Sequence, residues 1–160
     1  MKMKLYLDTS IPSAYFDYSK PVRQLITQKW FENDASSFEL YISVITIEEI
    51  EKLKNFNKRN KIKELIVNHN VKVLEISSEA IELANEYMNA GAIPQSEPED
   101  AYHIAVAAVN TVETLASWNF KHIVSINPIR KIHEVNRKLK YPMIEIGSLE
   151  LFGGSRYGNL

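Results

Sequence analysis

The stretch of sequence that decides the fold is Lys4-Leu5-Tyr6-Leu7-Asp8-Thr9-Ser10-Ile11-Pro12. Its apolar first half predicts a buried strand over residues 3–8, and Asp8 stands at the end of that strand. A hydroxyl residue followed shortly by Pro12 is typical of the start of a helix. The stretch therefore predicts a strand that passes directly into a helix, with an acidic side chain at the junction.

The rest of the chain continues this alternation of strands and helices. Further strands are expected at residues 39–45, 71–75, 114–117 and 143–146. Helices are expected at 10–17, 21–33, 46–56, 58–69, 78–90 and 128–139, with a largely buried helix around Asp100. Such alternation predicts an α/β fold with a mostly parallel central sheet, helices on both faces and residues 143–146 at a sheet edge.

Two further acids occupy positions similar to that of Asp8. Glu49 follows a β-branched run that becomes a helical pattern after Thr46, and Asp100 lies in the acidic opening of the buried helix. In an open α/β sheet, functional groups gather outside the carboxyl ends of the strands. The three acids are therefore expected to converge, and carboxylate oxygens are the ligands that hard divalent cations prefer.

Each acid also has a purely structural interpretation. Thr46 and Glu49 have the spacing of a helix-capping box, as do Ser96 and Glu99. Asp8 belongs to a residue type that commonly caps helices. Asp100 falls one position beyond the box formed by Ser96 and Glu99, so capping explains Asp100 less well than it explains Glu99. Because caps do not need to converge, the functional interpretation depends on the three acids together.

Four segments carry these residues in order: Leu5–Ser10, Ile42–Ile50, Glu99–Ala105 and Leu115–Ile123. They resemble the motifs of the PIN-domain nucleases and, within that family, of the VapC-like ribonuclease toxins of prokaryotic toxin–antitoxin pairs. The resemblance extends from about residue 4 to residue 145. The chain departs from it in the fourth segment, where Asn119 stands in place of the Asp of many members. The number of metal ions therefore stays open.

The resemblance implies a PIN-like nuclease domain over residues 1–146, followed by a C-terminal tail over residues 147–160. It implies cleavage of RNA with Mg²⁺ or Mn²⁺, a homodimer, and a small antitoxin protein whose segment fills the acidic groove. Glycines at 153, 154 and 158 suggest that the tail is flexible. The tail also contains apolar residues that are candidates to dock on the body of the protein or on a partner: Leu149, Leu151 and Phe152.

The residue types also suggest how such a site would work. Asp8 and Asp100 are the candidates for direct metal ligands, and the ion would lower the pKa of a bound water and orient it towards the scissile phosphorus. Glu49 would hold or deprotonate that water. The surrounding waters and ligand orientation would be fixed by Ser10, Ser117 and the side-chain carbonyl of Asn119.

Composition narrows the function classes. The chain has 160 residues, of which 45% are hydrophobic, which suits one domain with a substantial core. Cysteine is absent, which excludes disulfides, thiolate metal sites and a thiol nucleophile. The histidines lack a zinc-type spacing, and His103 is interpreted as a packing or hydrogen-bonding residue. With neither a signal peptide nor a segment of membrane-spanning length, a soluble cytoplasmic protein is expected.

A basic stretch follows Glu49, although the formal net charge of the chain is −1. It contains the predicted RNA-binding residues Lys52, Lys54, Lys58 and Arg59, followed by Lys61 and Lys63. This stretch is a candidate to guide a phosphate backbone towards the acids. The alternative, a solvated helical face, stays open because charge runs commonly serve solubility.

Other functions are compatible with parts of the pattern. A PIN-like module that binds RNA or protein with little or no turnover would be consistent with Asn119. A phosphotransfer enzyme that uses Asp8 as a nucleophile, as haloacid-dehalogenase-like proteins do, needs a second Asp where Ser10 stands. A dinucleotide site or a P-loop would require a glycine-rich turn that the sequence lacks after its first strand.

Overall fold

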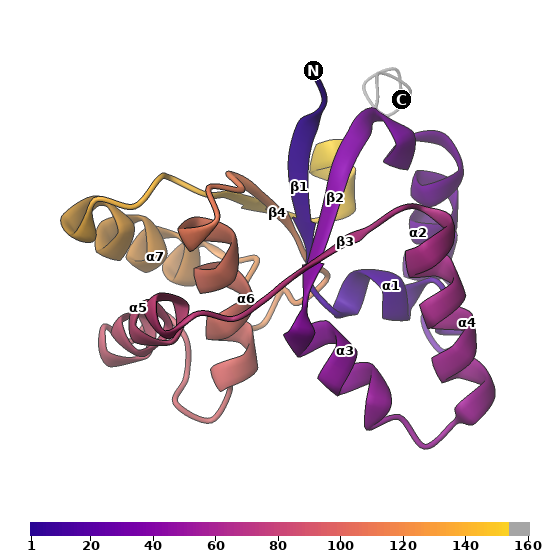
Figure 1. Ribbon diagram of the computed structural model, residues 1–160, viewed down its shortest axis with the longest axis horizontal. Helices are drawn as coiled ribbons and strands as arrows, with labels where there is room; N and C mark the ends of the chain where they lie inside the picture. Colours follow the sequence, from indigo (N-terminus) through magenta and orange to yellow (C-terminus); the bar gives the residue numbers. More distant parts are fainter. Residues whose placement is uncertain (154–160) are drawn as a thin grey trace.

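A five-stranded sheet lies between two layers of helices in the computed structural model, which describes residues 1–153 (Figure 1). The strands are β1 (Met3–Leu7), β2 (Phe38–Ser43), β3 (Lys72–Leu74), β4 (Thr114–Ala116) and β5 (Glu145–Gly147). They follow the order β3-β2-β1-β4-β5, and each neighbouring pair is parallel. This confirms the predicted α/β class and places the last strand at a sheet edge.

The helices divide between the two faces of this sheet (Figure 1). One layer contains α5 (Ser78–Asn89), α6 (Pro98–Val109) and α7 (Ile126–Leu139), and the other contains α1 (Ser10–Ala14), α2 (Pro21–Asn33) and α4 (Phe56–Asn68). Between the layers, α3 (Val44–Glu51) continues directly from β2. Two short 3₁₀ helices, η1 (Ala35–Ser37) and η2 (Leu149–Phe152), complete the described elements.

Side chains alternate between two hydrophobic cores, as the twofold repeat of a strand requires. In β1, Tyr6 packs into the core beneath α5, α6 and α7. Leu5 and Leu7 pack into the core beneath α1, α2 and α4. Burial on both faces explains why β1 is apolar almost throughout and why it occupies the centre of the sheet.

Neither of the two capping boxes that the sequence spacing suggested, Thr46 with Glu49 and Ser96 with Glu99, forms in the structure. Helix α3 begins earlier than expected, at Val44, because the hydroxyl of Ser43 caps it by accepting from the Ile45 backbone N–H. Thr46 therefore lies inside the helix, and the side chain of Glu49 is available for other contacts. Pro98 sets the start of α6, and no side chain caps that helix.

The chain after β5 returns to the body of the protein. Leu149 and Phe152 are buried in the core that includes α2, and the Phe152 carbonyl accepts a hydrogen bond from Trp30 Nε1 at 3.2 Å. Leu151 is exposed. The tail that was predicted to be flexible begins at residue 147, but Gly147 belongs to β5 and residues 149–152 form η2, so the prediction is wrong for this first part. From residue 154 onward the predicted tail lies outside the described residues. Within residues 1–153, no helix has the length and apolarity needed to cross a membrane.

Candidate active site

The predicted site residues lie near the carboxyl ends of three neighbouring strands. Asp8 follows β1, Glu49 lies on the helix that follows β2, and Ser117 and Asn119 follow β4. The chain builds β2 and β3 on one side of β1 and then crosses over to build β4 and β5 on the other. The point where strand order reverses is the usual position of a ligand crevice in open α/β sheets.

Asp8 is buried and held by hydroxyl groups from two segments. Its Oδ1 accepts from the backbone N–H of Ser10 at 3.0 Å and from the Ser10 hydroxyl, and its Oδ2 accepts from the Ser117 hydroxyl. Ser10 Oγ also accepts from the backbone N–H of Trp118 at 2.8 Å. These bonds connect the end of β1 to the segment after β4. Burial raises the pKa of Asp8, although the charge of His103 and the two hydroxyl bonds oppose the rise.

Glu49 belongs to a hydrogen-bond chain that reaches the core. Its Oε1 accepts from Thr9 Oγ1 at 2.8 Å and lies 3.0 Å from His103 Nε2. His103 Nδ1 lies 2.7 Å from the Tyr6 hydroxyl, which also bonds to Ser43. The prediction that His103 is a hydrogen-bonding residue is confirmed. Burial acts to raise the pKa of Glu49, but the hydrogen bond and charge of His103 outweigh it, so the pKa is lowered.

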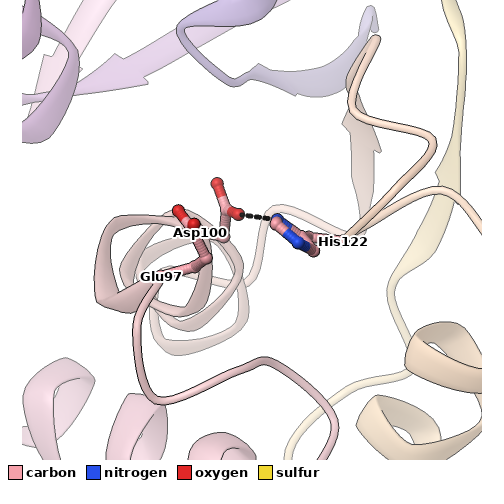
Figure 2. A group of neighbouring side chains, drawn as sticks. All are labelled: Glu97, Asp100 and His122. Carbon is pink, nitrogen blue, oxygen red and sulfur yellow. Dashed lines mark ion pairs between the residues drawn. The ribbon is translucent and has the colours of Figure 1, made fainter.

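Asp100 lies in the first turn of α6 and contacts the segment after β4. Its Oδ2 accepts from Asn119 Nδ2 at 3.1 Å and lies 3.4 Å from His122 Nδ1 (Figure 2). The side-chain carbonyl of Asn119, which is expected from the sequence to bind a water, accepts from the His122 backbone N–H at 2.9 Å. Burial, followed by the charge of Asp8, raises the pKa of Asp100 to about 6.

Asp100 also belongs to a cluster of possible metal ligands. Within residues 1–153, Glu97, Asp100 and His122 are the one set of three such residues with donor atoms all within 4.8 Å of one another (Figure 2). Glu97 lies one helical turn before Asp100, and His122 follows Asn119 by three residues. The spacing of one helical turn between Glu97 and Asp100 is the only feature of the sequence that could have indicated Glu97 as a possible metal ligand. The position of His122 depends on how the segment after β4 folds.

Asp8, Glu49 and Asp100 do not form a comparably tight trio. Instead, their charges influence one another across the site: Glu49 and Asp100 both interact electrostatically with Asp8, and all three interact with His103. A divalent cation among these groups would relieve the repulsion that helps to raise the pKa of Asp100. The carboxylate oxygens are a chemically suitable donor set for Mn²⁺ or Mg²⁺, whereas the imidazole of His122 is a donor that softer transition metals prefer.

The predicted RNA-binding residues have mixed surroundings. They are Lys52, Lys54, Lys58 and Arg59. The charge of Lys52 contributes to the lowered pKa of Glu49, which places this lysine near the site. Arg59 instead donates to the carbonyls of Glu51 and Leu53, and its guanidinium lies 5.0 Å from the centre of the Phe56 ring. Arg59 therefore helps to close the turn between α3 and α4.

Comparison with known proteins identifies the family. Residues 5–117 match the PIN domain, so the chain belongs to the PIN-domain family. No curated protein sequence matches it significantly. The matched region ends at Ser117 and includes Asp8, Glu49 and Asp100.

Solved structures share the fold at low sequence identity. VapC20 from Mycobacterium tuberculosis, described as a sarcin–ricin loop cleaving toxin, has a TM-score of 0.55 at 13% identity, over 78% of this chain and 98% of its own. VapBC2 from Rickettsia felis, bound to a promoter DNA fragment, has a TM-score of 0.53 at 14% identity, over 90% and 97%. FitAcB from Neisseria gonorrhoeae has a TM-score of 0.52 at 16% identity, over 90% and 96%.

Proposed function

We propose that this protein is a divalent-metal-dependent endoribonuclease and the toxin of a toxin–antitoxin pair. The observation that carries the proposal is the placement of Asp8 and Asp100 against one segment at the carboxyl end of the sheet, where Ser117 donates to Asp8 and Asn119 donates to Asp100. Membership of the PIN-domain family supports the same conclusion, as does the shared fold with VapC20, a toxin that cleaves the sarcin–ricin loop.

Asp8 and Asp100 are the proposed carboxylate ligands, with Glu97 and His122 as additional donors beside Asp100. A bound Mg²⁺ or Mn²⁺ would supply charge neutralisation at the phosphate and a more acidic water. The serine hydroxyls on Asp8 fix its orientation. Glu49 is ionised at neutral pH and can accept a hydrogen bond from an attacking water, so it is proposed to hold that water; its lowered pKa makes it a weak base.

Cleavage of labelled RNA tests this proposal. The purified protein is expected to cleave internal phosphodiester bonds with Mg²⁺ or Mn²⁺ and to lose this activity in EDTA. Asp8→Asn and Asp100→Asn should each abolish cleavage while the circular dichroism spectrum stays unchanged. Full activity in either folded variant would exclude that residue as an essential ligand.

The proposed partners follow from the toxin assignment. FitAcB and VapBC2 share the fold of this chain. We propose a small antitoxin as the partner that blocks the acidic site, and a homodimer as the state of this chain. Light scattering of the purified protein tests the dimer. A coexpressed product of the adjacent reading frame that copurifies and abolishes RNA cleavage would support the antitoxin.

A second candidate function is a PIN-like module that binds RNA or protein without turnover. The contact between Asn119 Nδ2 and Asp100 Oδ2 favours it, because an amide replaces a charged group and occupies an acceptor site of the proposed ligand. Calorimetric binding of Mn²⁺ without RNA cleavage would support this alternative. Metal-dependent cleavage that Asp100→Asn abolishes would exclude it.

A further inference from the structure

The segment Trp118–His122 borders two cavities that are otherwise lined by opposite helix layers. Trp118 and Phe120 line a cavity of about 350 Å³ with the beginning of α2. Lys121 and His122 line a larger cavity of about 880 Å³ with the connection before α6 and the beginning of α7. Between these neighbours, Asn119 points to Asp100. The two cavities therefore flank the proposed catalytic site.

The smaller cavity is lined by aromatic rings and two cationic side chains, with one carboxylate, that of Glu150. Phe120 is 47% exposed, although it adjoins the site, whereas Trp118 beneath it is buried. The Arg23 guanidinium lies 5.3 Å from the Trp118 ring centre and 5.6 Å from that of Phe120. Exposed aromatic rings and guanidinium planes are the surfaces on which unpaired nucleobases stack. The volume lies near the lower end of the range for small-ligand pockets.

The larger cavity has the charge that a phosphate backbone requires. Lys121 and Lys131 both line it and are exposed, and His122 connects it to the cluster around Asp100. None of its described lining residues has a carboxylate side chain. A basic groove beside an acidic centre would hold a polyanion whose scissile phosphate must approach carboxylates.

We propose that a single-stranded RNA crosses the site along the segment Trp118–His122. One nucleobase stacks on Phe120 and the Arg23 guanidinium, and phosphates on the other side of the cleavage point contact Lys121 and Lys131. This inference rests on the proposed nuclease function and specifies which residues hold a base and the phosphates of its RNA substrate. It also assigns substrate contacts that are separate from the basic stretch between α3 and α4.

Binding is measured by the fluorescence anisotropy of a short, labelled, single-stranded RNA of mixed sequence, in buffer with Ca²⁺. Phe120→Ala is expected to weaken binding about tenfold, as loss of one base stack does, and Phe120→Tyr to retain most of it. RNA with abasic positions should bind Phe120→Ala and the unaltered protein equally. The same RNA annealed to its complement should bind poorly.

A matched pair of double variants tests the basic groove. The double variant Lys121→Ala with Lys131→Ala should reduce the slope of log Kobs against log[salt] by about 1 in magnitude. This is the change expected for loss of one to two phosphate contacts on a single strand. Lys2→Ala with Lys29→Ala removes the same charge from exposed positions outside the groove and should leave that slope unchanged.

The proposal fails if the unaltered protein does not bind the single strand, if Phe120→Ala binds as tightly, or if both lysine pairs act equally. If this surface binds a protein partner rather than RNA, Phe120→Ala should bind the RNA as tightly as the unaltered protein does. Cleavage in Mn²⁺ is scored separately. RNA binding with these properties but no cleavage would refute the nuclease function and leave the RNA path intact.

Discussion

At the scale of single residues, each acid has a different set of hydrogen-bond donors. Asp8 accepts from two serine hydroxyls, Glu49 from Thr9, and Asp100 from the amide of Asn119. A carboxylate in place of Asn119 would bring a second acceptor against the same oxygen of Asp100. The sequence identified these acids but not this arrangement, because the orientation of an amide depends on neighbours such as the His122 backbone N–H.

Asp100 is expected to lower the stability of the metal-free protein at neutral pH. Its pKa is raised to about 6, so its stabilising contribution is present at low pH and is lost as the pH rises through this value. Asp100→Asn should therefore increase the free energy of unfolding by about 1–2 kcal/mol near pH 7, with allowance for partial solvent screening. The increase should shrink as the pH falls towards about 4. Thermal unfolding in EDTA across this pH range measures it, and an unchanged or lower melting temperature at neutral pH would contradict it.

His103 is expected to position Glu49 through Nε2. In His103→Gln the amide nitrogen can reach the position of Nε2 and donate to Glu49, whereas in His103→Asn it can reach only that of Nδ1, beside Tyr6. We expect His103→Asn to lower kcat by about a hundredfold, within the range of general acid–base effects, and His103→Gln to retain most activity. KM should change little in either variant.

The measurement is steady-state cleavage of RNA, with thermal unfolding of both variants as the control for folding. Equal kcat values for the two variants at equal stability would show that His103 has only a packing role.

At the scale of elements, most strands and helices follow from sequence periodicity, but the start of α3 does not. The β-branched run around Val44 and Ile45 suggested a longer strand, whereas the buried hydroxyl of Ser43 ends β2 and begins the helix. Tertiary contact decides this boundary, because Ser43 also accepts from the hydroxyl of Tyr6 on β1. The same shift of register leaves Glu49 directed at His103 rather than at a cap.

Ser43→Ala is expected to affect both the stability of α3 and catalysis. Loss of the cap should cost about 1 kcal/mol, and the unpaired Tyr6 hydroxyl should disturb the contact of His103 with Glu49. Ser77→Ala is the matched control, because Ser77 caps α5 by accepting from the Ala80 backbone N–H. Urea unfolding and cleavage rates should show similar destabilisation in both variants and reduced kcat only in Ser43→Ala. Equal kcat values would refute the coupling.

At the scale of the whole molecule, strand order brings distant residues to the carboxyl end of the sheet. The alternation of strands and helices was sufficient to predict the parallel sheet, while a shared site of Asp8, Glu49 and Asp100 stays a prediction. It was not sufficient to predict Glu97 and His122 as neighbours. Their placement depends on how the connections before α6 and after β4 cross the end of the sheet, and this depends on packing between helices rather than on periodicity.

A bound divalent cation is expected to stabilise the entire fold, because its ligands come from separate elements. At a free Mn²⁺ concentration of about 100 times Kd, binding would add about 2.7 kcal/mol to the free energy of unfolding. For a domain of this size, that corresponds to an increase in melting temperature of roughly 5–10 °C. The combined Asp8→Asn and Asp100→Asn variant should show no increase. A cation-independent melting temperature for the unaltered protein would refute binding at this site.

The position of β1 at the centre of the sheet affects when the proposed site can form during translation. Asp8 is among the first residues synthesised, but Ser117, which donates a hydrogen bond to it, follows both α6 and β4 in the chain. A ribosome that has made only the first six helices has therefore delivered all three acids without the scaffold that fixes their arrangement. Under the proposed function, a nascent chain that lacks the segment after β4 is expected not to cleave RNA.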